Sequence, residues 1–366
     1  MHNAELSPRL IFWELTSGCN LRCIHCRASA QPERGPDEVT AEEAFQVIDQ
    51  ITAFSRPILI LTGGEPLYHP DVFTIASYAT RQGLRVALAT NGTLVDERTA
   101  LAIRQAGISR VSISLDGPDA VTHDTFRGLS GAFSAAIRGL QLLRERGGIS
   151  LQVNTTVARH NVEQLPQMLD LCLRLGVDAF HLFLLVPVGC GLEVAEEQEV
   201  SPEEYEKTLN WLYDHQFGRE AAGIELKATC APHYFRVIRQ RAKQDGIKVT
   251  RETHGMAAMT KGCLAGTGVC FISSTGRVQP CGYLPIEAGN VRITPFQTIW
   301  EEAEVFRELR RPDILSGKCG ICEYRTLCMG CRARAFGTTG DPFSEEPYCI
   351  YEPVAMRRQA TGVIHA

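Results

Sequence analysis

The sequence predicts an α/β protein in which a parallel sheet of six strand–helix units precedes a cysteine-rich region. Apolar runs of strand length alternate with helical patterns from residue 10 to residue 185. These runs are apolar along nearly their whole length, as is typical of parallel strands that helices cover. Eight of the fourteen cysteines lie between Cys263 and Cys349. We therefore expect a strand–helix domain over residues 1–190, a bridging region over 191–262 and a cysteine-rich domain over 263–366.

The pattern places six strands and five helices in this region, which makes six strand–helix units or nearly so. Strands are expected at residues 11–15, 58–62, 85–90, 110–115, 151–156 and 179–185. Helices are expected at residues 41–54, 72–82, 96–106, 131–145 and 162–175. The first helix has the clearest start, because Thr40 is a good N-cap and Glu43 stands at the capping-box position. Farther along, the pattern predicts helices at 201–215, 236–243 and 298–309 and a loop at 246–262.

The composition narrows the class of protein. The chain has 366 residues, 44% of them hydrophobic, which is enough for a sizeable core. The net charge of −5 gives no support for nucleic-acid binding. The N-terminus lacks the pattern of a signal peptide and the apolar runs are too short to cross a membrane, so we expect a cytoplasmic protein. In that compartment, clustered cysteines indicate metal clusters rather than disulfides.

A cysteine triplet follows the first strand. Cys19, Cys23 and Cys26 have C-x3-C-x2-C spacing, which suits three irons of a four-iron, four-sulfur cube and leaves the fourth iron open. A structural zinc ion is the alternative, but zinc prefers four protein ligands. No fourth cysteine lies nearby, and His25 is too cramped between two of the cysteines to join them.

The second strand leads into the sequence Thr62-Gly-Gly-Glu-Pro66. Together with the triplet, this segment resembles the radical S-adenosylmethionine (radical SAM) superfamily. The resemblance implies a partial (β/α)6 barrel, a [4Fe-4S] cluster bound to the triplet and SAM bound to that cluster. Chemistry is then expected at the C-terminal ends of the strands. The position before Cys26 is usually aromatic in this superfamily, and His25 departs from that pattern.

The resemblance also implies which residues line the SAM pocket. Glu65 is expected to accept from the SAM ammonium, Arg127 to hold its carboxylate, and Asn154 to face its ribose or carboxylate. For Asp116, the alternative to a place in this pocket is a turn-forming role before Gly117. For Asn154, the alternative is a role in capping the end of its strand. The full set of expected SAM contacts is Gly63, Gly64, Glu65, Pro66, Asn91, Ser114, Arg127 and Asn154.

The later cysteines resemble the SPASM domain, which carries auxiliary iron–sulfur clusters. That pattern assigns one cube to Cys263, Cys270, Cys281 and Cys331, and another to Cys319, Cys322, Cys328 and Cys349. Two auxiliary [4Fe-4S] clusters are favoured by the count of eight cysteines. The spacing from Cys328 to Cys331 is one residue short of the pattern, so a single auxiliary cluster remains an alternative, as does structural zinc.

Residues 227–236, in the bridging region, are dense in polar and aromatic groups. Their cations suit carboxylates and their aromatic rings suit a flat ligand, so we expect them to contact the substrate; the alternative is a surface turn that enters a basic helix. The candidates are Lys227, Cys230, His233, Tyr234 and Arg236. Of the remaining cysteines, Cys172 lies on an apolar helix face and is expected to pack in the core. Cys190 follows the sixth strand at the expected catalytic mouth.

Four segments resemble the radical SAM enzymes of siroheme-dependent haem synthesis: TCAPHYFR, HLFLLVPVG, QPCGYLP with EAGNVR, and GCRARA. The FLLVPVG run is most similar to the haem b synthases. This resemblance implies oxidative decarboxylation of two propionates of iron-coproporphyrin III to vinyl groups. It implies an iron-porphyrin substrate, an electron donor such as a flavodoxin or ferredoxin, and an auxiliary cluster that accepts the surplus electron. Neither a nucleic-acid nor a membrane partner is expected.

Other functions stay open at this stage. The deacetylase of 12,18-didecarboxysiroheme fits the same residues. A peptide maturase of the SPASM type is disfavoured, because such enzymes often carry a leader-binding domain and only about ten residues precede the first strand. A non-catalytic electron carrier needs neither the open triplet nor the Gly-Gly-Glu-Pro segment.

Overall fold

A computed structural model describes residues 7–218 and 223–360 of the chain. Within them lies a ten-stranded sheet in the order β10-β9-β8-β1-β2-β3-β4-β5-β6-β7. The strands from β1 to β7 pair in parallel with their neighbours, which confirms the six predicted strands and their order. The strands are β1 (Leu10–Glu14), β2 (Ile58–Thr62), β3 (Arg85–Thr90), β4 (Arg110–Ser114), β5 (Ser150–Val157), β6 (Ala179–Leu184), β7 (Glu225–Thr229), β8 (Val269–Ile272), β9 (Arg277–Gln279) and β10 (Gly289–Asn290).

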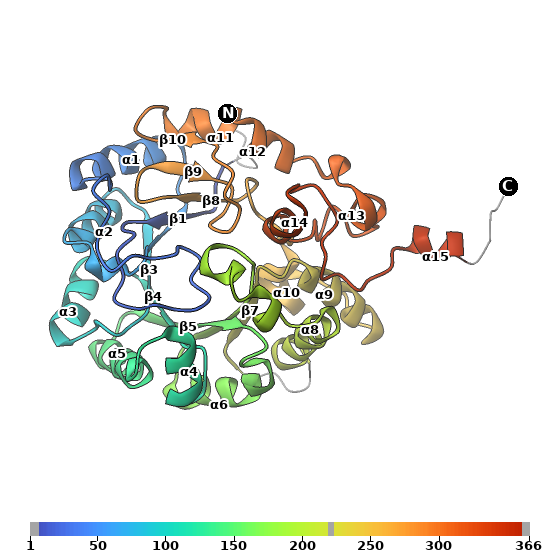
Figure 1. Cartoon of the computed structure of the whole chain (residues 1–366), viewed down its shortest axis with the longest axis horizontal. Coiled ribbons are helices and arrows are strands. Elements are labelled where there is room, and N and C mark those ends of the chain that lie inside the picture. Colours follow the sequence, from blue (N-terminus) through green and yellow to red (C-terminus); the bar gives the residue numbers. More distant parts are fainter. Residues whose placement is uncertain (1–6, 219–222, 361–366) are drawn as a thin grey trace.

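Helices cover the outer face of the curved sheet, as Figure 1 shows. Thr40 and Glu43 form the expected capping box at the start of the first helix. The helices that follow the first five strands are α1 (Ala41–Phe54), α2 (Val72–Arg81), α3 (Glu97–Gln105), α4 (Ala120–Arg127), α5 (Ala132–Arg146) and α6 (Leu165–Leu175).

The two faces of the sheet differ in accessibility. Side chains that point to the helices, such as Ile11, Trp13 and Leu59, are fully buried in the main core. The alternate residues point inward, and many of them, such as Phe12 and Ile60, stay partly accessible. The curved sheet therefore has a packed outer face and an open inner face, which is where ligands bind in a barrel of this kind.

The sheet extends beyond the six predicted strands at both edges. At one edge β7 pairs in parallel with β6. At the other, β8 pairs in parallel with β1, and β9 and β10 continue in antiparallel order. The sequence analysis did not include β7, which has five residues and lacks the continuous apolar run of the six predicted strands. The cysteine-rich region is thus partly built into the same sheet as the barrel.

Three helical predictions need correction. The expected single helix at 298–309 is two helices, because Ala303 is extended, with φ −58° and ψ 128°. The expected loop at 246–262 contains α10 and the short η5 helix, and α4 was not predicted. The remaining helices are α7 (Ala195–Gln198), α8 (Pro202–Gln216), α9 (His233–Gln244), α10 (Arg251–His254), α11 (Phe296–Glu302), α12 (Glu304–Leu309), α13 (Gly317–Ile321), α14 (Arg332–Thr339) and α15 (Val354–Ala360). The 3-10 helices are η2 (Pro66–Tyr68), η3 (Val162–Gln164), η4 (Gly189–Leu192), η5 (Gly255–Ala258) and η6 (Pro312–Ile314).

A buried arginine joins the barrel to the cysteine-rich region. Arg334 in α14 donates to the carbonyl oxygens of Leu185 at 3.0 Å and Cys230 at 3.2 Å. Its other terminal nitrogen lies 2.8 Å from Glu346, and both side chains are almost fully buried. Among the described residues, no helix has the length and apolar character needed to cross a membrane.

Candidate functional site

The cysteine triplet lies in the loop that leaves β1, at the C-terminal ends of the parallel strands. Its sulfur atoms accept hydrogen bonds: Leu21 N–H to Cys19 at 3.4 Å, Ala30 N–H to Cys26 at 3.4 Å, and Arg127 to Cys23 at 3.7 Å. Donors aimed at sulfur are one of the means by which proteins tune iron–sulfur clusters. Burial raises the pKa of the Cys19 thiol to about 11, so binding of iron to this thiol releases a proton at neutral pH.

A buried carboxylate fixes the start of this loop. Glu38 accepts from Ser17 N–H at 2.7 Å, Thr16 Oγ1 at 2.9 Å and Gly35 N–H at 3.0 Å, and it pairs with Arg34 at 2.8 Å. Burial alone would raise the pKa of Glu38, but the donors from Ser17 and Gly35 outweigh it and hold the pKa below its usual value. The loop that carries the triplet is therefore anchored before any ligand binds.

The glycines after β2 let two loops touch. Gly64 N–H donates to Thr16 O at 2.7 Å, and Glu65 N–H donates to Gly18 O at 2.8 Å. A Cβ atom on Gly64 would lie only 2.4 Å from Gly18 O, and one on Gly63 would lie 2.7 Å from Thr16 O. Pro66 then begins the η2 helix. The Gly-Gly-Glu-Pro segment thus packs directly against the cysteine loop.

Glu65 connects the ends of two neighbouring strands. Its carboxylate is fully buried and accepts from Thr90 Oγ1 at 2.6 Å, Asn91 N–H at 2.8 Å and Leu67 N–H at 3.1 Å. Burial raises the pKa of Glu65 to about 6, and these donors oppose the rise. Oε2 accepts from one donor only, so it keeps a free lone pair, and acceptance from a SAM ammonium stays a prediction for Glu65. Within the protein, Glu65 ties the end of β2 to the end of β3.

A charged network lies beside Cys23. Arg127 Nε lies 2.6 Å from Asp116 Oδ2, and Asp116 also accepts from Thr156 N–H at 2.7 Å. His25 stacks on Phe126 with a centroid distance of 4.0 Å. Burial lowers the pKa of His25 to about 3, so its ring is neutral. Arg127 is therefore fixed next to the triplet, and contact with a SAM carboxylate remains a prediction for it. Asp116 has an ion-pairing role rather than only a turn-forming one.

A polar row crosses the open inner face. Ser114 pairs in register with Asn154, Asn154 with His181, and His181 with Lys227. Asn91, at the end of β3, donates to Asn20 at 2.9 Å beside Cys19. The sequence named Ser114, Asn154 and Lys227 but missed His181. His181 stands between two apolar residues of one strand. Because successive side chains of a strand point to opposite faces, this position could have indicated that His181 shares a face with Asn154.

The titratable side chains of this row differ in their partners. His181 Nε2 lies 3.4 Å from Glu225, and Arg110 also pairs with Glu225 at 3.0 Å. The hydrogen bond from His181 lowers the pKa of Glu225 to about 2. Lys227 has no ion pair within the described residues, and its side chain is exposed on the inner face. The row therefore offers one unpaired cation to a ligand in the barrel.

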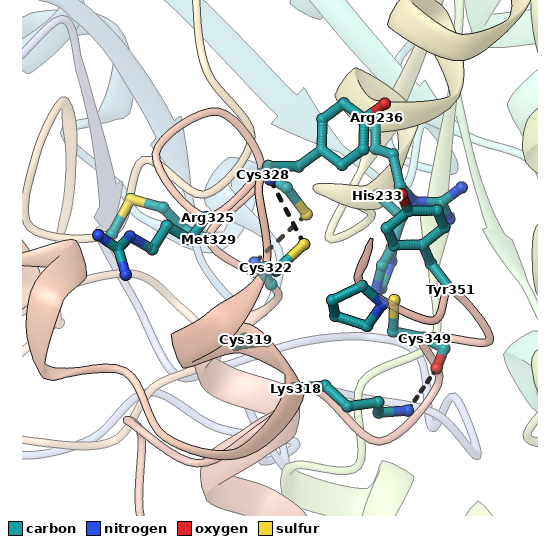
Figure 2. Close-up of a pocket in the computed structure, with 13 residues that line it drawn as sticks. His233, Arg236, Lys318, Cys319, Cys322, Arg325, Cys328, Met329, Cys349 and Tyr351 are labelled. Atoms are coloured by element: carbon teal, nitrogen blue, oxygen red, sulfur yellow. Dashed lines mark hydrogen bonds between the residues drawn. The ribbon is translucent and has the colours of Figure 1, made fainter. Parts of the chain in front are cut away.

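Four of the late cysteines surround one pocket. Cys319, Cys322, Cys328 and Cys349 line this pocket, together with His233 (Figure 2). Backbone N–H groups of Tyr324, Gly330 and Glu346 donate to three of the sulfur atoms, each at 3.4 Å.

The charges around this pocket suit an anionic ligand. Burial opposes ionisation of Cys349, but His233 and Arg236 hold the pKa of its thiol below the usual value. Lys318 also lines the pocket and donates to Cys349 O at 2.7 Å. The set therefore fits the donor chemistry of a four-iron cube.

The other predicted set is divided. Cys263 and Cys281 pack against the small core that contains Cys331. Cys270 lies elsewhere: it is fully buried in β8, in register with Ile11, and belongs to the main core. The structure therefore corrects its assignment as a cluster ligand. Cys172 is buried in the main core as expected.

The spacing of the side chains in the fold distinguishes a site for a single metal ion from a site for a four-iron cluster. Across residues 7–218 and 223–360, no three His, Cys, Asp or Glu side chains converge as closely as a single metal ion requires. The cysteines of a four-iron cluster each bind a different iron, so they stand farther apart than the ligands of one ion.

Three predicted substrate residues are buried and held by partners within the protein. His233 Nε2 lies 2.7 Å from Glu346, Tyr234 donates to Gln216, and Arg236 pairs with Glu206. All three side chains are nearly inaccessible. The structure therefore corrects their assignment as substrate contacts and gives them internal roles.

Family models and known proteins match this sequence over most of its length. The family model described as the radical SAM superfamily matches residues 13–172, and the SPASM model, described as an iron-sulfur cluster-binding domain, matches residues 263–332. The chain is 54% identical to the AdoMet-dependent heme synthase of Methanosarcina barkeri, covering 95% of this chain and 97% of that protein. It is 50% identical to the AdoMet-dependent heme synthase of Nitratidesulfovibrio vulgaris, covering 95% and 94%.

Solved structures share the fold. The chain matches anSMEcpe with bound AdoMet with a TM-score of 0.70 and 19% identity, covering 93% of this chain and 94% of that one.

Proposed function

Because the chain belongs to the radical SAM enzymes with a SPASM domain, in the group of the AdoMet-dependent heme synthases, we propose that it makes haem b from iron-coproporphyrin III. Two propionates of the substrate become vinyl groups. Each conversion removes one hydrogen atom from the β-carbon, releases one carbon dioxide and leaves one surplus electron. The observation that carries this proposal is 54% identity over nearly the full length of a heme synthase.

The triplet of Cys19, Cys23 and Cys26 would hold the first [4Fe-4S] cluster. With SAM bound, that cluster supplies an alkyl radical able to remove hydrogen from an unactivated carbon. The protein must then hold the target C–H bond in a near-attack position and away from water. Glu38 and Glu65 serve this end by fixing the loops on which the cofactor rests.

The inner-face row suits a substrate with several carboxylates. Lys227 is an unpaired cation within the described residues, and His181, Asn154 and Ser114 lie beside it in register. Such groups would hold a propionate by charge-assisted hydrogen bonds in a poorly solvated space. Binding of the propionates that do not react would position the propionates that do. We place substrate binding on this row.

The surplus electron needs an acceptor. We propose two auxiliary [4Fe-4S] clusters in the cysteine-rich region for that role. The support is the proximity of the loops: Arg27, next to Cys26, donates to the carbonyl oxygen of Gly282, next to Cys281. An electron donor such as a flavodoxin or ferredoxin would reduce the first cluster.

Anaerobic incubation of the reconstituted protein with SAM, reductant and iron-coproporphyrin III tests the proposal. Mass spectrometry should show loss of two carboxyl groups, with 5'-deoxyadenosine formed in step. A Cys23→Ala variant is the control and should form neither product. Acetate loss from 12,18-didecarboxysiroheme without reaction of iron-coproporphyrin III would favour the deacetylase instead. Absence of 5'-deoxyadenosine from fully loaded protein would overturn the enzymatic assignment.

A further inference from the structure

We propose that Cys230 is the fourth cysteine of the set formed by Cys263, Cys281 and Cys331, and that a four-iron cluster there joins the barrel to the cysteine-rich region. The set needs a fourth ligand because a cluster of this type is held by four thiolates. Sequence spacing pointed to Cys270, which the fold removes from the set. This inference does not depend on the identity of the substrate.

Strand geometry excludes Cys270. Successive side chains of a strand point to opposite faces. Phe271, its neighbour in β8, faces the Cys281 loop: the Arg27 guanidinium lies 4.6 Å from its ring centroid, and a Cβ atom on Gly282 would lie 3.3 Å from its ring. Cys270 therefore points away from that loop and into the main core. Burial alone raises the pKa of its thiol, and no other cysteine contributes to the shift.

Cys230 lies where the missing ligand is needed. It follows β7 and packs, with Cys263 and Cys281, against the small core that contains Cys331. The thiols of Cys331, Cys281 and Cys263 are close neighbours of its sulfur atom. The four sulfur-bearing side chains thus belong to one neighbourhood.

The backbone at Cys230 is also specialised. Its φ is 58°, in the left-handed region that residues other than glycine seldom adopt. Its carbonyl oxygen accepts from Tyr205 at 3.2 Å and from Arg334 at 3.2 Å. Strained residues held by surrounding contacts are common at functional positions. These contacts hold the backbone from which the thiol extends, and the buried Arg334 would place positive charge beside an anionic cluster.

The four ligands would come from four separate segments. Cys230 leaves β7, Cys263 precedes β8, Cys281 follows β9 and Cys331 precedes α14. The cluster would therefore connect both edges of the barrel sheet, since β7 and β8 lie on its two sides. Loss of this cluster should loosen β7, which carries Lys227.

Iron content and spectroscopy test the assignment. The full-length Cys230→Ala, Cys270→Ala and Cys172→Ala variants are reconstituted anaerobically and analysed for iron and sulfide, then by electron paramagnetic resonance after reduction. We expect Cys230→Ala to lose about four irons per chain, or to show a three-iron signal. Cys270→Ala and Cys172→Ala should keep the full content, because both cysteines are buried in the main core.

A second variant separates ligation from folding. Cys230→Ser supplies an oxygen in place of sulfur and should retain iron but change the resonance of one auxiliary cluster. Full iron content and an unchanged spectrum in both Cys230 variants would overturn the proposal. Iron loss in Cys270→Ala equal to that in Cys230→Ala would overturn it as well. Circular dichroism identifies any variant that has failed to fold. If Cys230→Ala fails to fold, the Cys230→Ser variant decides the outcome.

Discussion

Arg27 donates to the carbonyl oxygen of Gly282 at 3.2 Å and so joins two loops that are far apart in the sequence. Arg27 directly follows Cys26, and Gly282 directly follows Cys281. The same guanidinium pairs with Glu14 at 3.0 Å. One side chain thus connects the loop proposed to hold the first cluster to a loop proposed to hold an auxiliary one.

Substitution of Arg27 by Met should uncouple SAM cleavage from product formation. Cleavage of SAM depends on the triplet and should continue, whereas product formed per 5'-deoxyadenosine should fall about ten- to a hundredfold. This range corresponds to losing about 1.5–3 kcal/mol from a charge-assisted hydrogen bond. Quantifying haem and 5'-deoxyadenosine in the same reaction measures the ratio. The exposed Arg22 lies in the same loop, so Arg22→Met is the control. An unchanged ratio in Arg27→Met would contradict the role given to this contact.

Replacing Glu38 by Gln should weaken the anchor of the cysteine loop. The amide cannot accept from all the donors that the carboxylate binds, so the free energy of unfolding should fall by about 1–3 kcal/mol at pH 7. The pKa of Glu38 is lowered in the folded protein. Its stabilising contribution is therefore fully present above the unfolded pKa of about 4.3 and is lost as the pH falls through the folded value.

Urea unfolding of wild-type and Glu38→Gln protein at decreasing pH measures this difference. The gap between the two should be constant near neutral pH and should narrow in acid. Glu33 is exposed in the same loop, so Glu33→Gln should unfold like the wild type at every pH. A gap that stays constant into acid would show that the carboxylate charge is not what anchors the loop.

Much of the barrel could be predicted from the sequence, because its strands are nearly continuous apolar runs that alternate with helical patterns. The six strands have this character, and the capping box of Thr40 and Glu43 marks a helix start by local chemistry alone. By contrast, β7 is short and carries Glu225 and Lys227 on its inner face, so it lacks the continuous apolar run that marks the other strands. The parallel pairing of β8 with β1 joins residues that are distant in the sequence and leaves no local signal.

The site was less predictable where the direction of a side chain decides its role. Cys270 has a spacing that suits a ligand, yet its place on β8 turns it into the core. His233 and Arg236 are residue types common at surfaces, but their partners Glu346 and Glu206 come from distant segments and draw them inside. Spacing identifies candidate ligands, whereas strand register and long-range pairing decide which of them converge.

Lys227→Met should weaken substrate binding without affecting the first cluster. Loss of one charge-assisted contact of about 1.5–3 kcal/mol should raise KM for iron-coproporphyrin III about ten- to a hundredfold. SAM cleavage without substrate should be unchanged. Lys227→Arg should restore part of the affinity, because it keeps the positive charge. Steady-state kinetics of both variants, with the exposed Lys243→Met as control, measure the effect. A normal KM in Lys227→Met would remove the inner-face row from the substrate site.

The buried pair of Arg334 and Glu346 connects the barrel to the cysteine-rich region. The two side chains lie 2.8 Å apart, with 1% and 0% exposure. Neighbouring charges, with His233 foremost, overcome burial and lower the pKa of Glu346 to about 2. Arg334 also donates to backbone carbonyl oxygens at the end of β6 and after β7. Removing either charge would leave the other without one of its partners in a site from which water is excluded.

A double-mutant cycle should therefore show strong coupling in this pair. Arg334→Met alone should lower the free energy of unfolding by about 3–5 kcal/mol, since it leaves a buried carboxylate short of a partner. Glu346→Gln alone should also destabilise the protein, and the double variant should lose less than the sum of the two. Denaturant unfolding of the four proteins gives the coupling energy. Additive losses would mean that the two side chains act independently, and that the barrel is held to the cysteine-rich region by the backbone contacts of Arg334 rather than by the ion pair.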